Sequence, residues 1–119
     1  MLLRYLLFLV VFGGPQQGKD TPLVQNGTAS VYAPRFDGQR TSSGQVYRSH
    51  LLSAAHKTLP PGTRVRVTHL KNGCSIELII NDRLPKQSPH LIDLSPKAAS
   101  QIEIPTQGIG RVRIEELRP

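Results

Sequence analysis

The stretch RVRVTHLKNGCSIELII, residues 64–80, decides the fold of this 119-residue chain. Apolar and polar side chains alternate over residues 64–69 and again over residues 75–80, and a period of two is typical of a half-buried β-strand. Asn72 and Gly73 lie between these segments and favour a turn, because both residue types tolerate a positive φ. The stretch therefore predicts a β-hairpin. The side chains that we expect to face the core are Val65, Val67, Ile76, Leu78 and Ile80.

Beyond the hairpin the chain reads IINDRLP, residues 79–85, and the apolar run ends abruptly in Asn81, Asp82 and Arg83. A carboxylate at the end of a buried strand suits either a structural hydrogen bond or acid–base chemistry. Burial would raise the pKa of Asp82, whereas the guanidinium of Arg83 would lower that pKa if it turned inward. These residues by themselves leave both roles of Asp82 open.

The remaining segments predict further short strands and a short helix. Residues 27–32 are small and β-prone, residues 37–45 are rich in turn formers, and residues 110–117 alternate as a strand does. Ser95 and Pro96 match the cap and the first turn of a helix. Many short strands, together with ten glycines and ten prolines, predict a mainly β fold in the form of a small barrel with one or two short helices.

The chain begins with MLLRYLLFLVVFGG, in which one basic residue precedes a short apolar run and small residues. This layout predicts a signal peptide over residues 1–18, because the apolar run is far shorter than the ~20 residues of a membrane-spanning helix. A buried N-terminal strand or helix is the alternative. Residues 19–26 are polar and are typical of a linker, which leaves residues 27–119 as one folded domain.

A signal peptide places the protein outside the cytoplasm, in the periplasm or the cell envelope. We expect no lipid anchor, because the leader contains no cysteine and Cys74 lies far from the N-terminus. The net charge of +7 favours anionic partners such as cell-wall polymers, phospholipid head groups or nucleic acid. A solvated basic face that aids solubility is the bland alternative. Three Tyr, three Phe and no Trp supply few stacking platforms for bases, so we expect no nucleic-acid partner.

Two further residues are candidates for chemistry. Asp93 lies between two apolar residues just ahead of the predicted helix, where its carboxylate suits hydrogen bonds to the first helical amides; direct catalysis is the alternative. His56 follows two alanines, a setting more often structural than catalytic. The four histidines and one cysteine show no metal-ligand spacing, so we expect neither a metal nor another cofactor.

Four motifs in order resemble the rare lipoprotein A (RlpA-like) family: GTASVYAPRFDGQRTSSGQ from residue 27, AAHKTLPPGTRVRVTHLKNG from residue 54, IINDRLP from residue 79 and LIDLSPKAA from residue 91. The resemblance spans about residues 27–117. It implies a six-stranded double-psi β-barrel, which barwin and the first domain of expansins share. It also implies lytic transglycosylase activity: cleavage of peptidoglycan between N-acetylmuramic acid and N-acetylglucosamine without water, which leaves a 1,6-anhydromuramic end, with a preference for strands stripped of peptide stems.

The resemblance implies roles for three of these residues. Asp82 aligns with the family's carboxylate and is the expected acid/base, since an intramolecular transfer can use one carboxylate where a glycoside hydrolase needs two. His56 aligns with the family's site histidine and would orient, or share a proton with, the carboxylate or the sugar. Asp93 aligns with the essential Asp of expansins, so we expect it to line the same groove.

Some family positions differ in this chain. Gln45 stands where the family commonly has Glu, and Leu84 replaces a glycine. Val31 and Ala33 replace the outer residues of a Trp-Tyr-Gly motif, which leaves its tyrosine. The substrate-binding residues that we expect are Tyr32, Gln45, Arg83 and Asp93.

The expected partner is the glycan strand of peptidoglycan, bound by a monomer with no stable membrane span. Two other functions fit the same residues. One is a non-catalytic, expansin-like domain that binds or loosens the wall through the same groove, which the loss of the acid at Gln45 favours. The other is an inhibitor or an interaction partner of other envelope proteins. Retention of His56 and Asp82 at the family spacing favours the enzyme.

Overall fold

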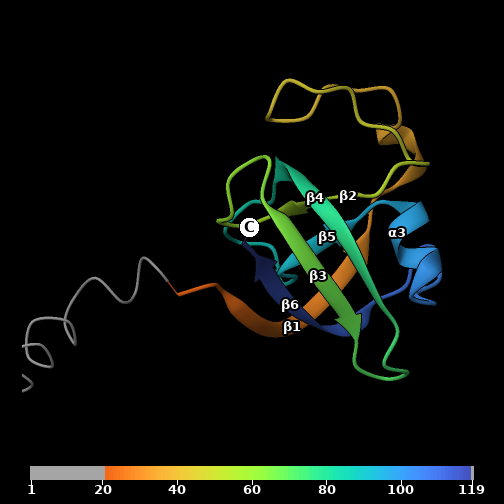
Figure 1. The fold of residues 1–119 in the computed structure, drawn as a ribbon. Helices are drawn as coiled ribbons and strands as arrows, with labels where there is room; N and C mark the ends of the chain where they lie inside the picture. The colour runs from red at the N-terminus through yellow and green to blue at the C-terminus, as the bar shows by residue number, and fades with distance from the viewer. Residues whose placement is uncertain (1–20, 119) are drawn as a thin grey trace, which may run out of the picture.

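The computed structural model describes residues 21–118 of the chain and shows a closed β-barrel (Figure 1). The strands follow one another around the barrel in the order β1-β5-β2-β4-β3-β6. This confirms the predicted six-stranded barrel with short helices. The elements are β1 (Val24–Val31), the 3-10 helix η1 (Pro34–Phe36), β2 (Ser53–His56), β3 (Arg64–His69), β4 (Ser75–Arg83), β5 (Ile92–Leu94), α3 (Pro96–Gln101) and β6 (Gly110–Leu117).

The hairpin predicted over residues 64–80 is confirmed as the antiparallel pair β3 and β4. The turn between them uses a positive φ of 76° at Gly73, as the Asn-Gly sequence predicts. All five side chains expected in the core are buried, and Glu77, which alternates with them, is exposed. The strand β4 continues beyond the predicted end of the hairpin at Ile80 and includes Asp82 and Arg83. The polar end of IINDRLP therefore still belongs to the sheet.

The strand β1 begins at Val24, so the linker predicted over residues 19–26 is wrong in its last three residues. Val24 pairs with Glu115 of β6, and Asn26 pairs with Arg113. The polar composition of this stretch suggested a linker, but a strand with one face toward solvent can be polar and still pair through its backbone. The predicted signal segment, residues 1–18, lies outside the described residues.

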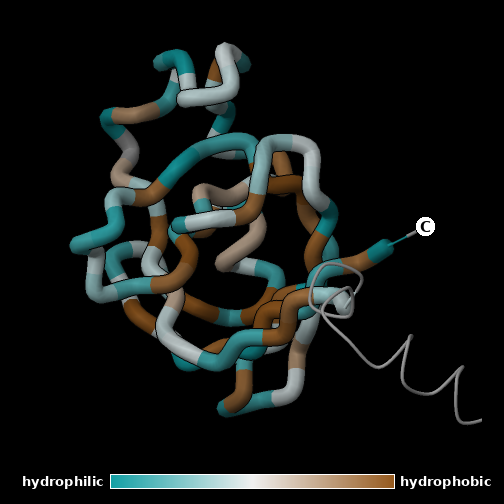
Figure 2. Tube along the Cα trace, turned by 90° about the vertical axis from the view of Figure 1, so that its left-hand side faces the viewer, coloured by the Kyte–Doolittle hydropathy of each residue, from teal (hydrophilic) through white to brown (hydrophobic). Residues whose placement is uncertain are grey.

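The helix α3 begins as the sequence predicts. Ser95 is its N-cap, and its Oγ accepts a hydrogen bond of 3.3 Å from the amide of Ala98. Asp93 does not take this role, so the prediction that its carboxylate bonds the helix start is wrong. Ala98 and Ala99 are fully buried against the barrel core. In Figure 2 the apolar segments concentrate in the body of the barrel, while the loop that stands above it is mainly hydrophilic.

Two parallel strand pairs set up the upper end of the barrel. β2 runs parallel to β4, β1 runs parallel to β5, and β2 also pairs antiparallel with β5. The short strand β2 therefore lies between β4 and β5. The long segment between β1 and β2, residues 32–52, crosses this end and forms the loop seen at the top of Figure 1. This arrangement brings segments that are distant in sequence to one place.

Candidate functional site

Four residues from four adjacent strands lie side by side beneath this loop. Ala55 on β2 is the register partner of Asp82 on β4 and of Asp93 on β5. Asp93 is in turn the partner of Ser30 on β1. Register partners point to the same face of a sheet, so the two carboxylates share one face on either side of Ala55. Two strand spacings place their Cα atoms about 10 Å apart.

A β-bulge in β4 makes this arrangement possible. Ala54 pairs with Ile80, whereas Ala55 pairs with Asp82, so Asn81 is the extra residue. Side chains alternate between the two faces of a strand. Without the bulge, Asp82 would share the core-facing side of Ile80. Bulges are common next to active sites because they redirect a side chain in this way.

Three donors hold the carboxylate of Asp82. Its Oδ2 accepts a hydrogen bond of 2.5 Å from the hydroxyl of Tyr32. Its Oδ1 accepts from the amides of Ser42, at 2.9 Å, and of Arg83, at 2.8 Å. Burial by itself would raise the pKa of Asp82, but the hydrogen bond from Tyr32 and those from the two amides outweigh burial and lower that pKa. Asp82 is therefore held as a charged carboxylate.

The hydroxyl of Tyr32 bonds to Asp82, while its ring is packed against other side chains. The ring stacks on Tyr47 with centroids 4.4 Å apart and meets the edge of Phe36 at 5.9 Å. These rings pack with Ala55, whose small side chain leaves room for them between the carboxylates. Burial first, and then the hydrogen bond to Asp82 and the charge of that carboxylate, raises the pKa of Tyr32, so its hydroxyl keeps its proton. Tyr32 is only 6% exposed, so its ring offers no stacking face to a sugar, and the substrate-binding role expected of this residue stays a prediction.

Asp93 has the opposite electrostatic setting. Burial is the largest influence and raises the pKa of Asp93, and the charge of Asp82 adds to this effect. The hydroxyl of Ser30 donates to its Oδ1 at 3.1 Å, which lowers the pKa in part. Asp93 therefore retains its proton to a higher pH than Asp82 does. Two carboxylates on one face with pKa values pushed apart form the pattern of an acid and a base.

His56 points away from this pair. It follows Ala55 directly on β2, so its side chain is on the other face of the sheet. Its Nδ1 accepts the amides of Thr58 and Leu59, both at 3.0 Å, which leaves the proton on Nε2 to donate to Oε1 of Gln25 at 2.9 Å. Burial, followed by the charges of nearby cations, lowers the pKa of His56 to about 4. The ring is neutral and fully buried, and its contacts organise the segment after β2.

The other two predicted binding residues are Arg83 and Gln45. The guanidinium of Arg83 turns back and donates from Nη1 to the carbonyl oxygens of His56, at 3.3 Å, and Leu59, at 3.1 Å. Its backbone amide, and not its side chain, contacts Asp82. Gln45 is exposed on the covering loop and lines a pocket beside the end of β4.

Comparison with known proteins places this geometry in a family. A family model described as "Lytic transglycolase" matches residues 24–114. The chain belongs to this family. The match begins at the first residue of β1, ends within β6 and includes Asp82, Asp93 and His56, so most of the barrel and both carboxylates lie within the matched region.

Curated relatives in this family are similar over the same region. The "Probable endolytic peptidoglycan transglycosylase RlpA" of Synechocystis sp. is 47% identical over 92 residues, which is 77% of this chain and 29% of that protein. The "Endolytic peptidoglycan transglycosylase RlpA" of Haemophilus influenzae is 48% identical over 94 residues, which is 79% of this chain and 33% of that protein. The chain thus spans about a third of the length of these relatives.

Among solved structures, Streptomyces papain inhibitor aligns with a TM-score of 0.61 over 81% of this chain and 96% of that chain. Its sequence is 19% identical, so the similarity supports the barrel fold alone. Together with the family match, it confirms the double-psi β-barrel class that the motifs predicted.

Several residues around the two carboxylates escaped the sequence analysis. Tyr47, Ser30 and Ser42 contact the tyrosine–carboxylate cluster from three segments, and Ala55 separates the two acids. None of these residues has an unusual local sequence. The Ala-Ala pair ahead of His56 carried the one usable signal, because two small residues in a strand allow a close approach of neighbouring side chains.

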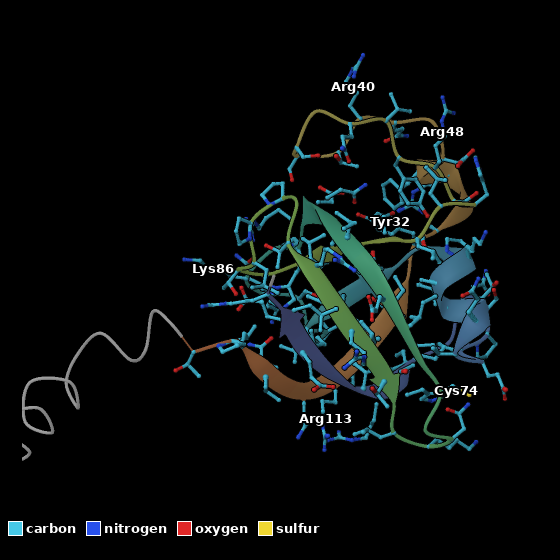
Figure 3. The ribbon with its side chains drawn as sticks, in the orientation of Figure 1. Tyr32, Arg40, Arg48, Cys74, Lys86 and Arg113 are labelled. Atoms are coloured by element: carbon cyan, nitrogen blue, oxygen red, sulfur yellow. The ribbon has the colours of Figure 1, made fainter. Side chains whose placement is uncertain are left out.

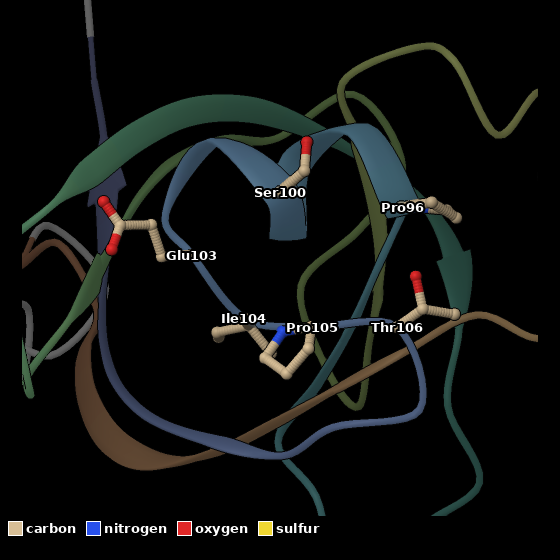
Figure 4. A pocket seen from close by; sticks show the side chains of 6 residues that line it. All are labelled: Pro96, Ser100, Glu103, Ile104, Pro105 and Thr106. Carbon is tan, nitrogen blue, oxygen red and sulfur yellow. The ribbon is translucent and has the colours of Figure 1, made fainter.

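Two hollows among the described residues are lined by other parts of the barrel. One, of about 330 Å³, lies between α3 and the following turn (Figure 4). Figure 3 shows Tyr32 beneath the loop that carries Arg40 and Arg48, with Cys74 at the opposite end of the barrel.

Within residues 21–118, His, Cys, Asp and Glu form no group that could hold a metal ion. The same residues include no helix of the length and apolar character that crossing a membrane requires.

Proposed function

We propose that this protein is an endolytic peptidoglycan transglycosylase that cuts glycan strands and leaves 1,6-anhydromuramic ends. The single observation that carries the proposal is the pair Asp82 and Asp93, which share one face and have pKa values shifted in opposite directions. Relatives at 47% and 48% identity bear that activity in their names. Their names support a location in the cell envelope, and we place the protein there as an exported monomer.

The pair divides the proton transfers of the reaction. Asp93 donates its proton to the glycosidic oxygen as the bond from that oxygen to C1 of the muramic sugar breaks. The C6 hydroxyl oxygen of the same sugar bonds to C1, and its proton passes to Asp82. The leaving sugar gains a hydroxyl, the muramic sugar gains its 1,6-anhydro bridge, and no water is consumed. Exchange of protons with solvent then restores both carboxyl groups.

The contacts of Asp82 suit a base. A carboxylate offers about four acceptor sites, and Tyr32, Ser42 and Arg83 fill three of them. One site remains for a substrate hydroxyl. This assignment changes the expectation that Asp82 alone serves as acid and base, because an acid needs a raised pKa and the pKa of Asp82 is lowered.

His56 and Tyr32 act as positioning residues in this mechanism. His56 fixes the amides of Thr58 and Leu59, and Arg83 fixes the carbonyl of Leu59. The segment after β2 is thereby bonded to Arg83, the residue that follows Asp82 at the end of β4. The net charge of +7 adds long-range attraction for a glycan whose muramic sugars carry carboxylates once the peptides are removed.

A non-catalytic, expansin-like wall-binding domain is the second candidate. Gln45 favours it, because this residue cannot titrate at a position where the family commonly has Glu and it lies exposed beside the groove. The two candidates differ in one respect: the binding domain forms no anhydro product from any glycan.

The deciding experiment is a digest of peptidoglycan, both intact and stripped of peptides by an amidase, with soluble products identified by mass spectrometry. We would compare the wild-type chain with Asp82→Asn, Asp93→Asn and Glu77→Gln. The last is the matched control, since Glu77 is an exposed acid on the outer face of the hairpin. Losing a general acid or base costs about 10²- to 10⁴-fold in rate.

Anhydromuramic ends from the wild type and the control, with neither site variant active, would support the enzyme and its acid–base pair. Activity retained by Asp93→Asn alone would return both proton transfers to Asp82. If no protein forms anhydro ends while all co-sediment with the glycan, the wall-binding candidate is the better description.

A further inference from the structure

A pocket of about 300 Å³ adjoins the carboxylate pair and is not used by the mechanism above. It lies between the covering loop, the start of β2 and the bulged part of β4. Ser53 and Asn81 form its polar part, and Leu52 and Ile79 form its apolar part. Gln45 and Arg48 line it from the loop.

Two polar atoms in this lining are buried and lack a hydrogen-bond partner among the described residues: Oγ of Ser53 and Oδ1 of Asn81. Ser53 is only 5% exposed. Leaving a buried donor or acceptor unpaired costs about 1–3 kcal/mol. Two such atoms in one pocket, next to apolar side chains, indicate a ligand that supplies both a donor and an acceptor.

The pocket continues the face on which the carboxylates lie. Ser53 precedes Ala55 by two residues on β2, so the two side chains share a face about 7 Å apart. Asn81 is the bulged residue and directly precedes Asp82. A glycan bound with its scissile bond at Asp82 and Asp93 would therefore place a neighbouring sugar at this pocket.

The acetamido group of an N-acetylated sugar matches both the polar and the apolar parts of this lining. Its carbonyl oxygen can accept from the hydroxyl of Ser53, and its N–H can donate to Oδ1 of Asn81. Its methyl group matches the apolar side chains of Leu52 and Ile79, the latter being 38% exposed in the unbound protein. A plain sugar hydroxyl could satisfy one of the polar atoms but would leave the apolar part uncovered.

We propose that this pocket is a subsite for the N-acetyl group of a sugar adjacent to the scissile bond, with Ser53 and Asn81 as its hydrogen-bonding residues. The inference rests on the proposed function to the extent that a glycan lies along this face. Both sugars of peptidoglycan carry the acetamido group. Arg48, which lines the pocket, would distinguish the two sugars. Its cation meets a carboxylate only when the bound sugar is muramic acid stripped of its peptide.

The test measures binding of oligomers of N-acetylglucosamine and of glucose, matched in length and linkage, to the full chain by titration followed with NMR. Ser53→Ala is the informative variant, because the hydroxyl that it removes has no partner among the described residues and its loss should not lower stability. Ser100→Ala, in the hollow beside α3, is the matched control.

We expect the wild type to prefer the N-acetylated oligomer, with shifts in the amide signals of Ser53, Asn81 and Ile79. Ser53→Ala should weaken that oligomer about tenfold and the glucose oligomer by a smaller factor, so that most of the preference is lost. Arg48→Ala should weaken only peptide-stripped peptidoglycan strands if the sugar is muramic acid. An equal loss for N-acetylglucosamine oligomers would mean that Arg48 does not read the carboxylate.

Equal binding of both oligomers by the wild type, or no effect of Ser53→Ala, would overturn the subsite. These outcomes are distinct from a failure of the proposed function. If Ser53→Ala forms anhydro ends with an unchanged KM, the proposed enzyme activity is supported and the subsite is not. If binding depends on the acetyl group but no anhydro ends form, the subsite is supported and belongs to a wall-binding domain.

Discussion

The hydroxyl of Tyr32 donates to Oδ2 of Asp82 across 2.5 Å and joins residues 50 positions apart in the chain. The ring of Tyr32 is stacked on Tyr47, which restricts the movement of its hydroxyl. Asp82 is thus fixed on one oxygen by the residue that follows β1 and on the other by two backbone amides. The charge state of the proposed base depends on this aromatic support.

Tyr32→Phe should move the acidic limb of the pH–activity profile upward. The ring and its stacking are kept, but a hydrogen bond that lowers the pKa of Asp82 is lost, so burial has more weight and the pKa rises. A hydrogen bond to a charged group contributes about 1.5–3 kcal/mol, and one pKa unit is about 1.4 kcal/mol. We expect an upward shift of about one unit in the acidic limb of kcat/KM, measured as release of anhydro ends.

Tyr47→Phe is the control for this change. The hydroxyl of Tyr47 is buried and has no hydrogen-bond partner among the described residues, so its removal should leave the acidic limb in place. If both variants shift the limb equally, or neither does, the Tyr32 hydroxyl does not set the pKa of the base.

Ser30→Ala should move the opposite limb. The hydroxyl of Ser30 donates to Asp93 and lowers its pKa in part. Without this bond the pKa of Asp93 rises further above its ordinary value, and the acid keeps its proton to a higher pH. The alkaline limb of kcat/KM should move upward by about one unit, while the acidic limb stays in place. An alkaline limb that moves downward, or an acidic limb that moves with it, would contradict the assignment of Asp93 as the acid.

Local sequence predicted the barrel well where a single segment contains its own pattern. The hairpin and the strand over residues 110–117 show an alternating pattern, and the start of the helix shows a capping residue, Ser95. The strands β2 and β5 were not predicted, because SAAH and IDL are too short to show a period. Their strand character comes from pairing with β4 and β1, which no local window contains.

The site residues likewise could be predicted only in part from the sequence. Asp82 could be predicted from its position at the end of an apolar run, and Asp93 from its apolar neighbours. The state of each acid could not be predicted, because the donors to Asp82 come from residues 32 and 42, and the bulge at Asn81 decides which face it occupies. The same bulge separates Asp82 from His56, which the family spacing suggested as its partner.

Arg83→Ala separates the side chain of Arg83 from its amide. The guanidinium bonds to His56 and Leu59 should be lost, lowering the free energy of unfolding by about 1 kcal/mol, a modest figure because the side chain is exposed. The amide that bonds Asp82 is kept, so the acidic limb should move less than in Tyr32→Phe. Urea unfolding and the pH profile check the two parts. A shift as large as that of Tyr32→Phe would show that the guanidinium charge, and not the hydrogen bonds, tunes Asp82.

His56 should make the fold sensitive to mildly acidic pH. Its pKa is lowered from 6.5 to about 4 in the folded protein, so between these values the unfolded chain binds a proton that the folded chain does not. Stability is therefore complete above pH 6.5 and is lost as the pH falls toward 4, by at most about 3 kcal/mol. His56→Gln cannot titrate and should remove this loss, although its lost hydrogen bonds lower stability at neutral pH. Urea unfolding of both proteins at pH 7.5 and 4.5 isolates the contribution of His56, because the shifted pKa of Asp93 acts in both. Equal losses in the two proteins would show that the ring is protonated in the fold, and would restore a proton-sharing role for His56 at the site.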